Sequence, residues 1–124
     1  MILRYSLLLL LVGCAPKGKV ETGLASWYGP GFAGKPTASG VRFRPSRRTA
    51  AHRTLPFGTV LRVTRVDTGK KVRVVVNDRG PFVSGRILDV SQRAARKLGM
   101  IRSGVVEVKI EVVGCKRRYK RCVR

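Results

Sequence analysis

Residues 59–76 read TVLRVTRVDTGKKVRVVV, and this stretch decides the fold class. Its two halves, residues 59–66 and 71–76, are rich in valine and threonine and enclose a short turn that contains a glycine. This pattern is typical of a β-hairpin. Alternate valines of the second half share one face of the strand, and a continued pleat would place Asp78 on that face too. The hairpin predicts a protein built mainly from strands.

Three further strands are predicted on either side of the hairpin. Residues 22–28 (TGLASWY) precede it, and residues 86–90 (RILDV) and 104–113 follow it. In the last segment apolar residues alternate with charged ones, so we expect Glu107 and Glu111 to face the solvent and to pair with arginines. Five short strands point to a small β-barrel rather than to an α/β sheet.

The connections contain one helix and one long loop. Ser91 can cap a helix through residues 92–98, and Gly99 is placed to end it. Asp89 is predicted to fix the start of this helix. Residues 29–40 hold four glycines and two prolines and are predicted to form a loop. Loops of this length are often functional.

The charge of the chain is strongly one-sided. Its 124 residues include 27 Lys or Arg but only 6 Asp or Glu, for a formal net charge of +21. This length gives one domain, and the charge favours an anionic partner such as nucleic acid, anionic lipid or a wall polymer. Because carboxylates are scarce and His52 is the one histidine, no metal site and no cofactor is predicted.

The amino-terminal segment has the pattern of an export signal. Residues 1–13 carry one arginine and an apolar run that is too short to span a bilayer, which is typical of a signal peptide. The motif that ends at Cys14 resembles the lipobox of bacterial lipoproteins. This resemblance implies that Cys14 is lipidated and anchors the protein to a membrane, and an ordinary secretory signal cleaved slightly later is the alternative. Residues 14–22 are predicted to be a tether.

Residues 114–124 form a basic, cysteine-containing tail. If Cys14 is lipidated, Cys115 and Cys122 are the one possible disulfide in an oxidising compartment, and two free thiols are the alternative. The tail is predicted to contact anionic lipid or a wall polymer. No specific nucleic-acid partner is expected, because export argues against one.

Two segments hold the candidate catalytic side chains. His52 lies in a loop just before the hairpin, and Asp78 ends its second strand within the sequence NDRGPF. A carboxylate at a strand end is rigidly placed and can face a cleft, which suits a general acid. The alternatives are an Asx turn for Asp78 and a buried structural role for His52. Trp27 and Tyr28 can stack on a sugar ring or belong to the core.

Five motifs together resemble the rare lipoprotein A family, in its order and spacing. They read ASWYG at residues 25–29, TASG at 37–40, AAHRTLPFG at 50–58, NDRGPF at 77–82 and GRILDVS at 85–91. The resemblance implies a six-stranded double-psi β-barrel over residues 23–113, in an envelope lipoprotein that acts on septal peptidoglycan. It also implies an endolytic lytic transglycosylase that cleaves between N-acetylmuramic acid and N-acetylglucosamine in peptide-free glycan strands.

The resemblance assigns roles to individual residues. It places the family's catalytic pair on Asp78 and His52. Asp78 would act first as acid and then as base while the muramoyl 6-hydroxyl closes a 1,6-anhydro ring, so a second carboxylate is not needed. His52 would orient the substrate or hydrogen-bond Asp78. Other motif residues are predicted to bind the glycan: Trp27, Tyr28, Thr37, Ser39, Arg53, Asn77 and Arg79.

Two positions depart from the family pattern. Val41 stands where the family usually has Glu, and Arg44 stands where it usually has Asp. A groove that is normally part acidic is therefore expected to be basic, and an arginine near Asp78 would favour its ionised form, which opposes a general-acid role. The alternative function is a non-catalytic peptidoglycan-binding envelope lipoprotein that uses the same groove.

Overall fold

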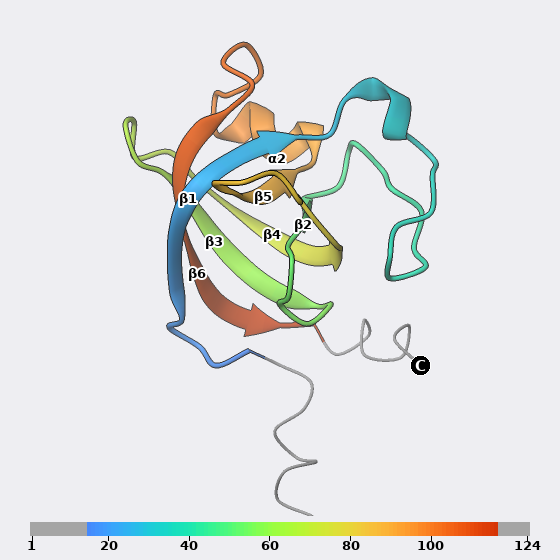
Figure 1. Ribbon diagram of the computed structural model, residues 1–124, viewed down its shortest axis with the longest axis horizontal. Coiled ribbons are helices and arrows are strands. Elements are labelled where there is room, and N and C mark those ends of the chain that lie inside the picture. The colour runs from blue at the N-terminus through green and yellow to red at the C-terminus, as the bar shows by residue number, and fades with distance from the viewer. Residues whose placement is uncertain (1–14, 117–124) are drawn as a thin grey trace, which may run out of the picture.

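The computed structural model describes residues 15–116, which form a closed six-stranded barrel (Figure 1). The predicted signal peptide, Cys14, Cys122 and most of the basic tail lie outside the described residues. Along the chain come β1 (Val20–Trp27), the 3-10 helix η1 (Pro30–Phe32), β2 (Thr49–Ala51), β3 (Thr59–Arg65), β4 (Lys71–Asp78), β5 (Arg86–Val90), α2 (Gln92–Lys97) and β6 (Val106–Cys115). Within the described part, no helix is long and apolar enough to cross a bilayer.

The strand order around the barrel is β1-β5-β2-β4-β3-β6. β1 pairs with β5 in parallel, and β2 pairs with β4 in parallel, whereas the other neighbours are antiparallel. The hairpin predicted from residues 59–76 is the antiparallel pair β3 and β4. The predicted all-β class, a closed six-stranded barrel with one short helix, is confirmed.

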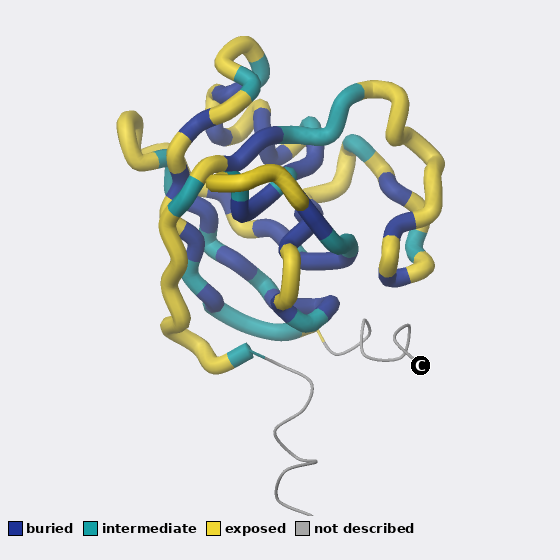
Figure 2. Tube along the Cα trace, in the orientation of Figure 1, coloured by how far each residue is buried: buried dark blue, intermediate teal, exposed yellow. Residues whose placement is uncertain are grey.

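The core fills the barrel because apolar side chains alternate with polar ones along the strands. On β6, Val106, Val108 and Ile110 are buried while Glu107 and Lys109 are exposed, as the period of two predicts. Figure 2 shows this alternation of buried and exposed positions around the barrel. The side chains that are most completely buried include Leu61, Leu88, Leu98, Met100 and Ile110.

Helix α2 begins and ends as the sequence predicts. The Ser91 hydroxyl accepts a hydrogen bond from the Ala94 N–H, and Gly99 follows the helix with a φ of +66° that glycine adopts without strain. Ala94 and Ala95 are the buried residues of the helix, which lies against β4. Their small size lets the helix approach the barrel closely.

The structure differs from the sequence-based strands by two or more residues in four places. β4 extends to Asp78, two residues beyond the predicted strand. β1 begins at Val20, so the last three residues of the predicted tether belong to the barrel. β6 begins two residues later than expected and extends to Cys115. β2 was not predicted, because Thr49–Ala51 is short and contains two alanines, which have little strand preference. Its pairing with β4 and β5 makes it a strand.

Candidate active site around Asp78

A bulge at the end of β4 determines where Asp78 points. β2 residue Ala50 lies opposite Val76, but the next residue, Ala51, lies opposite Asp78, so Asn77 is an extra residue on β4. A bulge of this kind bends the strand and redirects the side chains near it. The regular pleat that would have aligned Asp78 with the buried valines is therefore interrupted one residue before it.

The two oxygens of the Asp78 carboxylate have different partners. Oδ1 accepts hydrogen bonds from two backbone N–H groups, that of Ala38 at 2.8 Å and that of Arg79 at 2.9 Å. Oδ2 accepts a hydrogen bond from the Tyr28 hydroxyl at 2.5 Å. The carboxylate is thus held by three donors, two of which belong to the rigid backbone. Oδ2 has only the rotatable hydroxyl as its hydrogen-bond donor among the described residues.

Tyr28 is fixed by aromatic contacts on the loop that follows β1. Its ring stacks on Phe43 with centroids 4.4 Å apart, and it meets the edge of Phe32 at 5.3 Å. Burial, followed by the hydrogen bond to Asp78 and the negative charges of Asp78 and Asp89, raises the pKa of Tyr28 far above its ordinary value. The phenol therefore stays protonated next to Asp78. Tyr28 was predicted to stack on sugar, and here its ring packs on protein.

Thr37 and Ser39 shape the turn that holds Asp78. Both side chains are buried, their hydroxyls lie 2.9 Å apart, and the Thr37 hydroxyl donates to the Val41 carbonyl at 2.6 Å. The Ser39 N–H donates to the Asn77 carbonyl at 3.2 Å, which ties the turn to β4. Between them, Ala38 directs its N–H at Asp78. In this structure the two predicted glycan-binding hydroxyls position that backbone donor.

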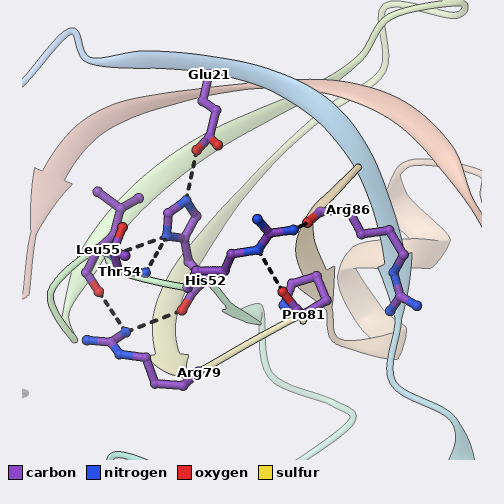
Figure 3. Close-up of polar contacts among 8 residues, drawn as sticks. Glu21, His52, Thr54, Leu55, Arg79, Pro81 and Arg86 are labelled. Atoms are coloured by element: carbon purple, nitrogen blue, oxygen red, sulfur yellow. Dashed lines mark hydrogen bonds and ion pairs between the residues drawn. The ribbon is translucent and has the colours of Figure 1, made fainter. Parts of the chain in front are cut away.

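His52 is buried, and its ring points to Glu21 and to the backbone of Thr54 and Leu55 (Figure 3). Its Nδ1 accepts hydrogen bonds from the backbone N–H groups of Thr54 and Leu55, both at 3.1 Å. Its Nε2 lies 2.9 Å from a carboxylate oxygen of Glu21, so the imidazole carries its proton on Nε2. Both ring nitrogens are occupied, and the proposed side-chain hydrogen bond from His52 to Asp78 is not present. The link between them is the backbone bond from the His52 N–H to the Asp78 carbonyl.

Two arginines, Arg53 and Arg79, fix the loops on either side of His52. The Arg79 guanidinium stacks 4.0 Å above the Phe57 ring and donates to the Leu55 carbonyl at 2.8 Å. Burial lowers the pKa of Arg79, and the nearby charge of Asp78 opposes this shift. Arg53 donates to the Pro81 carbonyl at 2.8 Å and also to the carbonyls of Val83 and Arg86. Both guanidinium groups are engaged in holding backbone.

Asp89 ties two strands together rather than starting the helix. Its carboxylate accepts from the Ser26 hydroxyl on β1 and from Arg86 at 2.5 Å. The helix start depends on Ser91 instead. The prediction that Asp89 is structural fits this geometry, but its expected place at the helix start was wrong, because its side chain faces β1.

The remaining predicted residues lie at the margins of this site. Trp27 is half-buried and packs against the hydrophobic core. Asn77 is buried, and Arg44 is exposed and is not one of the described residues that hydrogen-bond the Asp78 carboxylate. Glu111 pairs with Arg62 at 3.3 Å, as expected for a solvent-facing glutamate. Cys115 is disulfide-bonded, and its predicted pairing with Cys122 stays a prediction because Cys122 lies outside the described residues.

Sequence reasoning missed two members of the site. Glu21 was assigned to the tether, yet it lies on β1 and contacts a histidine 31 positions away. The second missed member is the N–H of Ala38, a backbone donor that no side chain in the sequence indicates. The TASG motif that contains it was the only pointer to this turn.

These features are those of a double-psi β-barrel protein with a carboxylate held at the end of a barrel strand. The chain belongs to the family described as "Lytic transglycolase", whose model matches residues 20–110.

Relatives of known name agree with this assignment. The probable endolytic peptidoglycan transglycosylase RlpA of a Nostoc strain is 61% identical over 94 residues, which cover 74% of this chain and 25% of the relative. The protein of the same name from Aquifex aeolicus is 51% identical over 110 residues, covering 85% of this chain and 49% of the relative. The chain therefore spans about a quarter to a half of these two relatives.

Two solved structures share the fold. The Streptomyces papain inhibitor superposes with a TM-score of 0.65 at 26% identity, covering 80% of this chain and 98% of the inhibitor. The expansin of Clavibacter michiganensis superposes with a TM-score of 0.60 at 26% identity, covering 77% of this chain and 51% of the expansin.

Proposed function

We propose that this protein is an endolytic peptidoglycan lytic transglycosylase of the bacterial cell envelope. The observation that carries the proposal is the geometry of Asp78, whose two oxygens are held in different ways at the end of a barrel strand. The names of the relatives, endolytic peptidoglycan transglycosylases, supply the substrate class. The reaction would cleave between N-acetylmuramic acid and N-acetylglucosamine in glycan strands.

The unequal partners of Asp78 suit a group that first gives up and then regains a proton. Oδ1 stays bound to two backbone donors in both states, so Oδ2 is the atom that holds the proton. When Oδ2 is protonated, the Tyr28 hydroxyl turns and accepts, and when it is ionised, Tyr28 donates to it. Oδ2 first protonates the leaving glycosidic oxygen. It then takes the proton of the muramoyl 6-hydroxyl while the oxygen of that hydroxyl attacks C1. The product is a 1,6-anhydro ring.

Exposed aromatic side chains near the site offer surfaces for sugar rings. Phe82, four residues beyond Asp78, is 80% exposed, and Phe32, which contacts Tyr28, is 49% exposed. An apolar ring face can pack on the C–H face of a pyranose. Trp27 and Tyr28 were predicted for this role. Trp27 instead packs against the hydrophobic core, and the ring of Tyr28 stacks on Phe43.

The test is product analysis with purified protein and peptide-free glycan strands. Mass spectrometry should show 1,6-anhydromuramoyl ends, and Asp78→Asn, which keeps the shape but cannot donate and regain the proton, should abolish them. Asp67→Asn is the matched control, because Asp67 is exposed in the β3–β4 turn and its one ion pair within residues 15–116 is with Arg65. If the unaltered protein forms no anhydro ends, the enzymatic function is wrong. If Asp78→Asn still forms them, the assignment of the acid is wrong.

We further propose that His52 is a positioning residue rather than a proton donor. Its ring satisfies two backbone N–H groups and so fixes the segment that packs beside Asp78. His52→Asn, whose amide oxygen can still accept from these groups, should retain more activity than His52→Ala and should unfold at a higher temperature. If both variants fold equally well and are equally inactive, the imidazole itself takes part in the reaction.

A second candidate function is glycan binding without cleavage. The observation that favours it is the presence of Val41 and Arg44 at two positions where the rare lipoprotein A family usually has acidic residues. In that case the protein would sediment with purified peptidoglycan but release no anhydro ends. Retention that is unchanged by Asp78→Asn would fit this function.

We also propose that Cys14 carries the lipid that anchors the protein in the envelope, an inference from sequence alone. Radiolabelled palmitate should be incorporated into the protein, and Cys14→Ser should abolish the label and release the protein from the membrane fraction. A label that remains in Cys14→Ser would contradict this proposal.

A further inference from the structure

A wide basic groove lies next to the Asp78 loop on the outer face of the barrel. Its volume is about 1200 Å³, and the described residues that line it include seven arginines and three lysines but no aspartate or glutamate. It begins at Val41 and Asn77, the neighbours of the turn that holds Asp78, and reaches Lys116 beyond β6. The groove is therefore adjacent to the site described above and shares Asn77 with it, but none of the side chains that line it donates a hydrogen bond to the Asp78 carboxylate.

Several parts of the fold contribute cations to the groove. Arg44, Arg47 and Arg48 come from the loop before β2, and Lys71 and Arg73 come from the outer face of β4. The two β4 cations are two residues apart, which places them about 6.6 Å from one another along the strand. The groove thus presents a spaced series of positive charges instead of a single cluster.

The charge arrangement in the groove is costly for the fold alone. Arg73 lies directly opposite Arg62 in the β3–β4 pair, and like charges in this position destabilise a sheet. Among the described residues, Arg62 is the only cation of the groove with a carboxylate partner, Glu111. Lys71 and Arg73 on β4 have no carboxylate partner among the described residues, and cations of this kind favour an anionic ligand that would neutralise them.

The chemistry of the lining residues points to the kind of anion. Seven of the ten cations are arginines, whose planar fork donates two parallel hydrogen bonds to phosphate oxygens. This density of charge matches a chain with one phosphate in every repeat better than a glycan with sparse carboxylates. No aromatic residue lies among the described lining residues, so the groove lacks the stacking surfaces that single-stranded nucleic acids use.

We propose that this groove binds a linear phosphodiester polymer that carries no bases. The polymer lies along the outer face of β3 and β4, with its phosphates against the arginines. This binding does not depend on the proposed cleavage of glycan, since no lining residue holds the Asp78 carboxylate through its side chain.

The test measures binding of the whole protein to a fluorescent, deacylated poly(glycerol phosphate). The affected variant is Arg47→Gln with Arg73→Gln, and the matched control is Arg96→Gln with Arg102→Gln, two exposed arginines outside the groove. We expect the groove variant to bind about tenfold more weakly. The plot of log affinity against log salt concentration should become shallower, with the magnitude of its slope smaller by about two. The control variant should change neither the affinity nor this slope appreciably. Equal losses in both variants would show attraction by net charge alone and would overturn the proposal.

Competing anions identify the class of ligand. Poly-glutamate of equal charge, oligothymidylate and phosphatidylglycerol vesicles should each bind the protein more weakly than poly(glycerol phosphate), and the groove variant should affect them less. Tighter binding of poly-glutamate would assign the groove to carboxylates. Tighter binding of oligothymidylate or of the vesicles would assign it to nucleic acid or to a membrane surface, and each of these results contradicts the phosphodiester proposal.

Discussion

At Tyr28 the environment of one phenol makes the stability of the protein depend on alkaline pH. Burial and the adjacent Asp78 raise the pKa of Tyr28 above its ordinary value of 10.0. In the unfolded chain the phenol ionises near pH 10, whereas in the native state it stays neutral. The unfolded state therefore holds fewer protons above pH 10, and the stability that is fully present below this pH falls as the pH rises.

The expected result is a loss of at most about 1.4 kcal/mol of unfolding free energy per pH unit above pH 10. Tyr28→Phe keeps the ring stacked on Phe43 but removes the phenol, so its stability should fall less steeply over the same range. Urea unfolding at pH 8, 10 and 11 measures this difference. Parallel curves for the two proteins would show that Tyr28 ionises equally easily in both states.

Residue identities in the site were more predictable than residue partners. Asp78 and the TASG turn could be selected from their motifs, and the structure places them in contact through the Ala38 N–H. The contact between His52 and Glu21 could not be predicted, because it depends on where β1 begins and on the barrel closing across 31 residues. Motifs identify chemically capable side chains, but the direction of a buried ring depends on backbone donors that the sequence does not show.

At the scale of elements, β1 and β5 approach so closely that one position requires glycine. A Cβ atom on Gly23 would lie 2.7 Å from Cγ2 of Ile87, a distance that real side chains do not tolerate. Gly23→Ala should therefore destabilise the protein by about 1 to 3 kcal/mol, because Ile87 or the strand must shift. Thermal or urea unfolding provides the measurement.

Two further variants make this expectation specific. Gly31→Ala is the control, since a Cβ there meets nothing within 4 Å. In the double variant Gly23→Ala with Ile87→Ala, the combined loss should be smaller than the sum of the two single losses, because the clash is gone. Additive losses would show that Gly23 is needed for another reason than its contact with Ile87.

The pairings that sequence patterns predicted are those whose partners are close in sequence. The β3–β4 hairpin and α2 carry their own turn and capping signals, and both occur as expected. The parallel pairs β1–β5 and β2–β4 carry no such local signal, since their strands are far apart in the chain. β2 in particular is a strand only because two neighbours hydrogen-bond it, which explains why the propensity of Thr49–Ala51 did not reveal it.

At the scale of the whole molecule, the net charge of +21 places the folded state under electrostatic repulsion. Folding brings the cations closer together, so the native state is penalised more than the unfolded chain. Salt shortens the screening length from about 30 Å at 0.01 M to about 8 Å at 0.15 M. We therefore expect the Tm to rise over this range of sodium chloride, as measured by circular dichroism.

The pair Arg62 and Arg73 should account for part of this rise, since the two lie directly opposite on β3 and β4. Removing one like charge is worth about 0.2 to 1 kcal/mol, so Arg73→Gln should raise the Tm at low salt by roughly 1 to 5 °C. The gain should shrink at 0.15 M, because screening already weakens the repulsion that the substitution removes. Arg102→Gln, an exposed site away from the sheet, should gain less. A Tm that falls in Arg73→Gln at low salt would show that packing of the Arg73 side chain outweighs its charge, and repulsion from Arg62 would then not indicate that Arg73 serves a ligand.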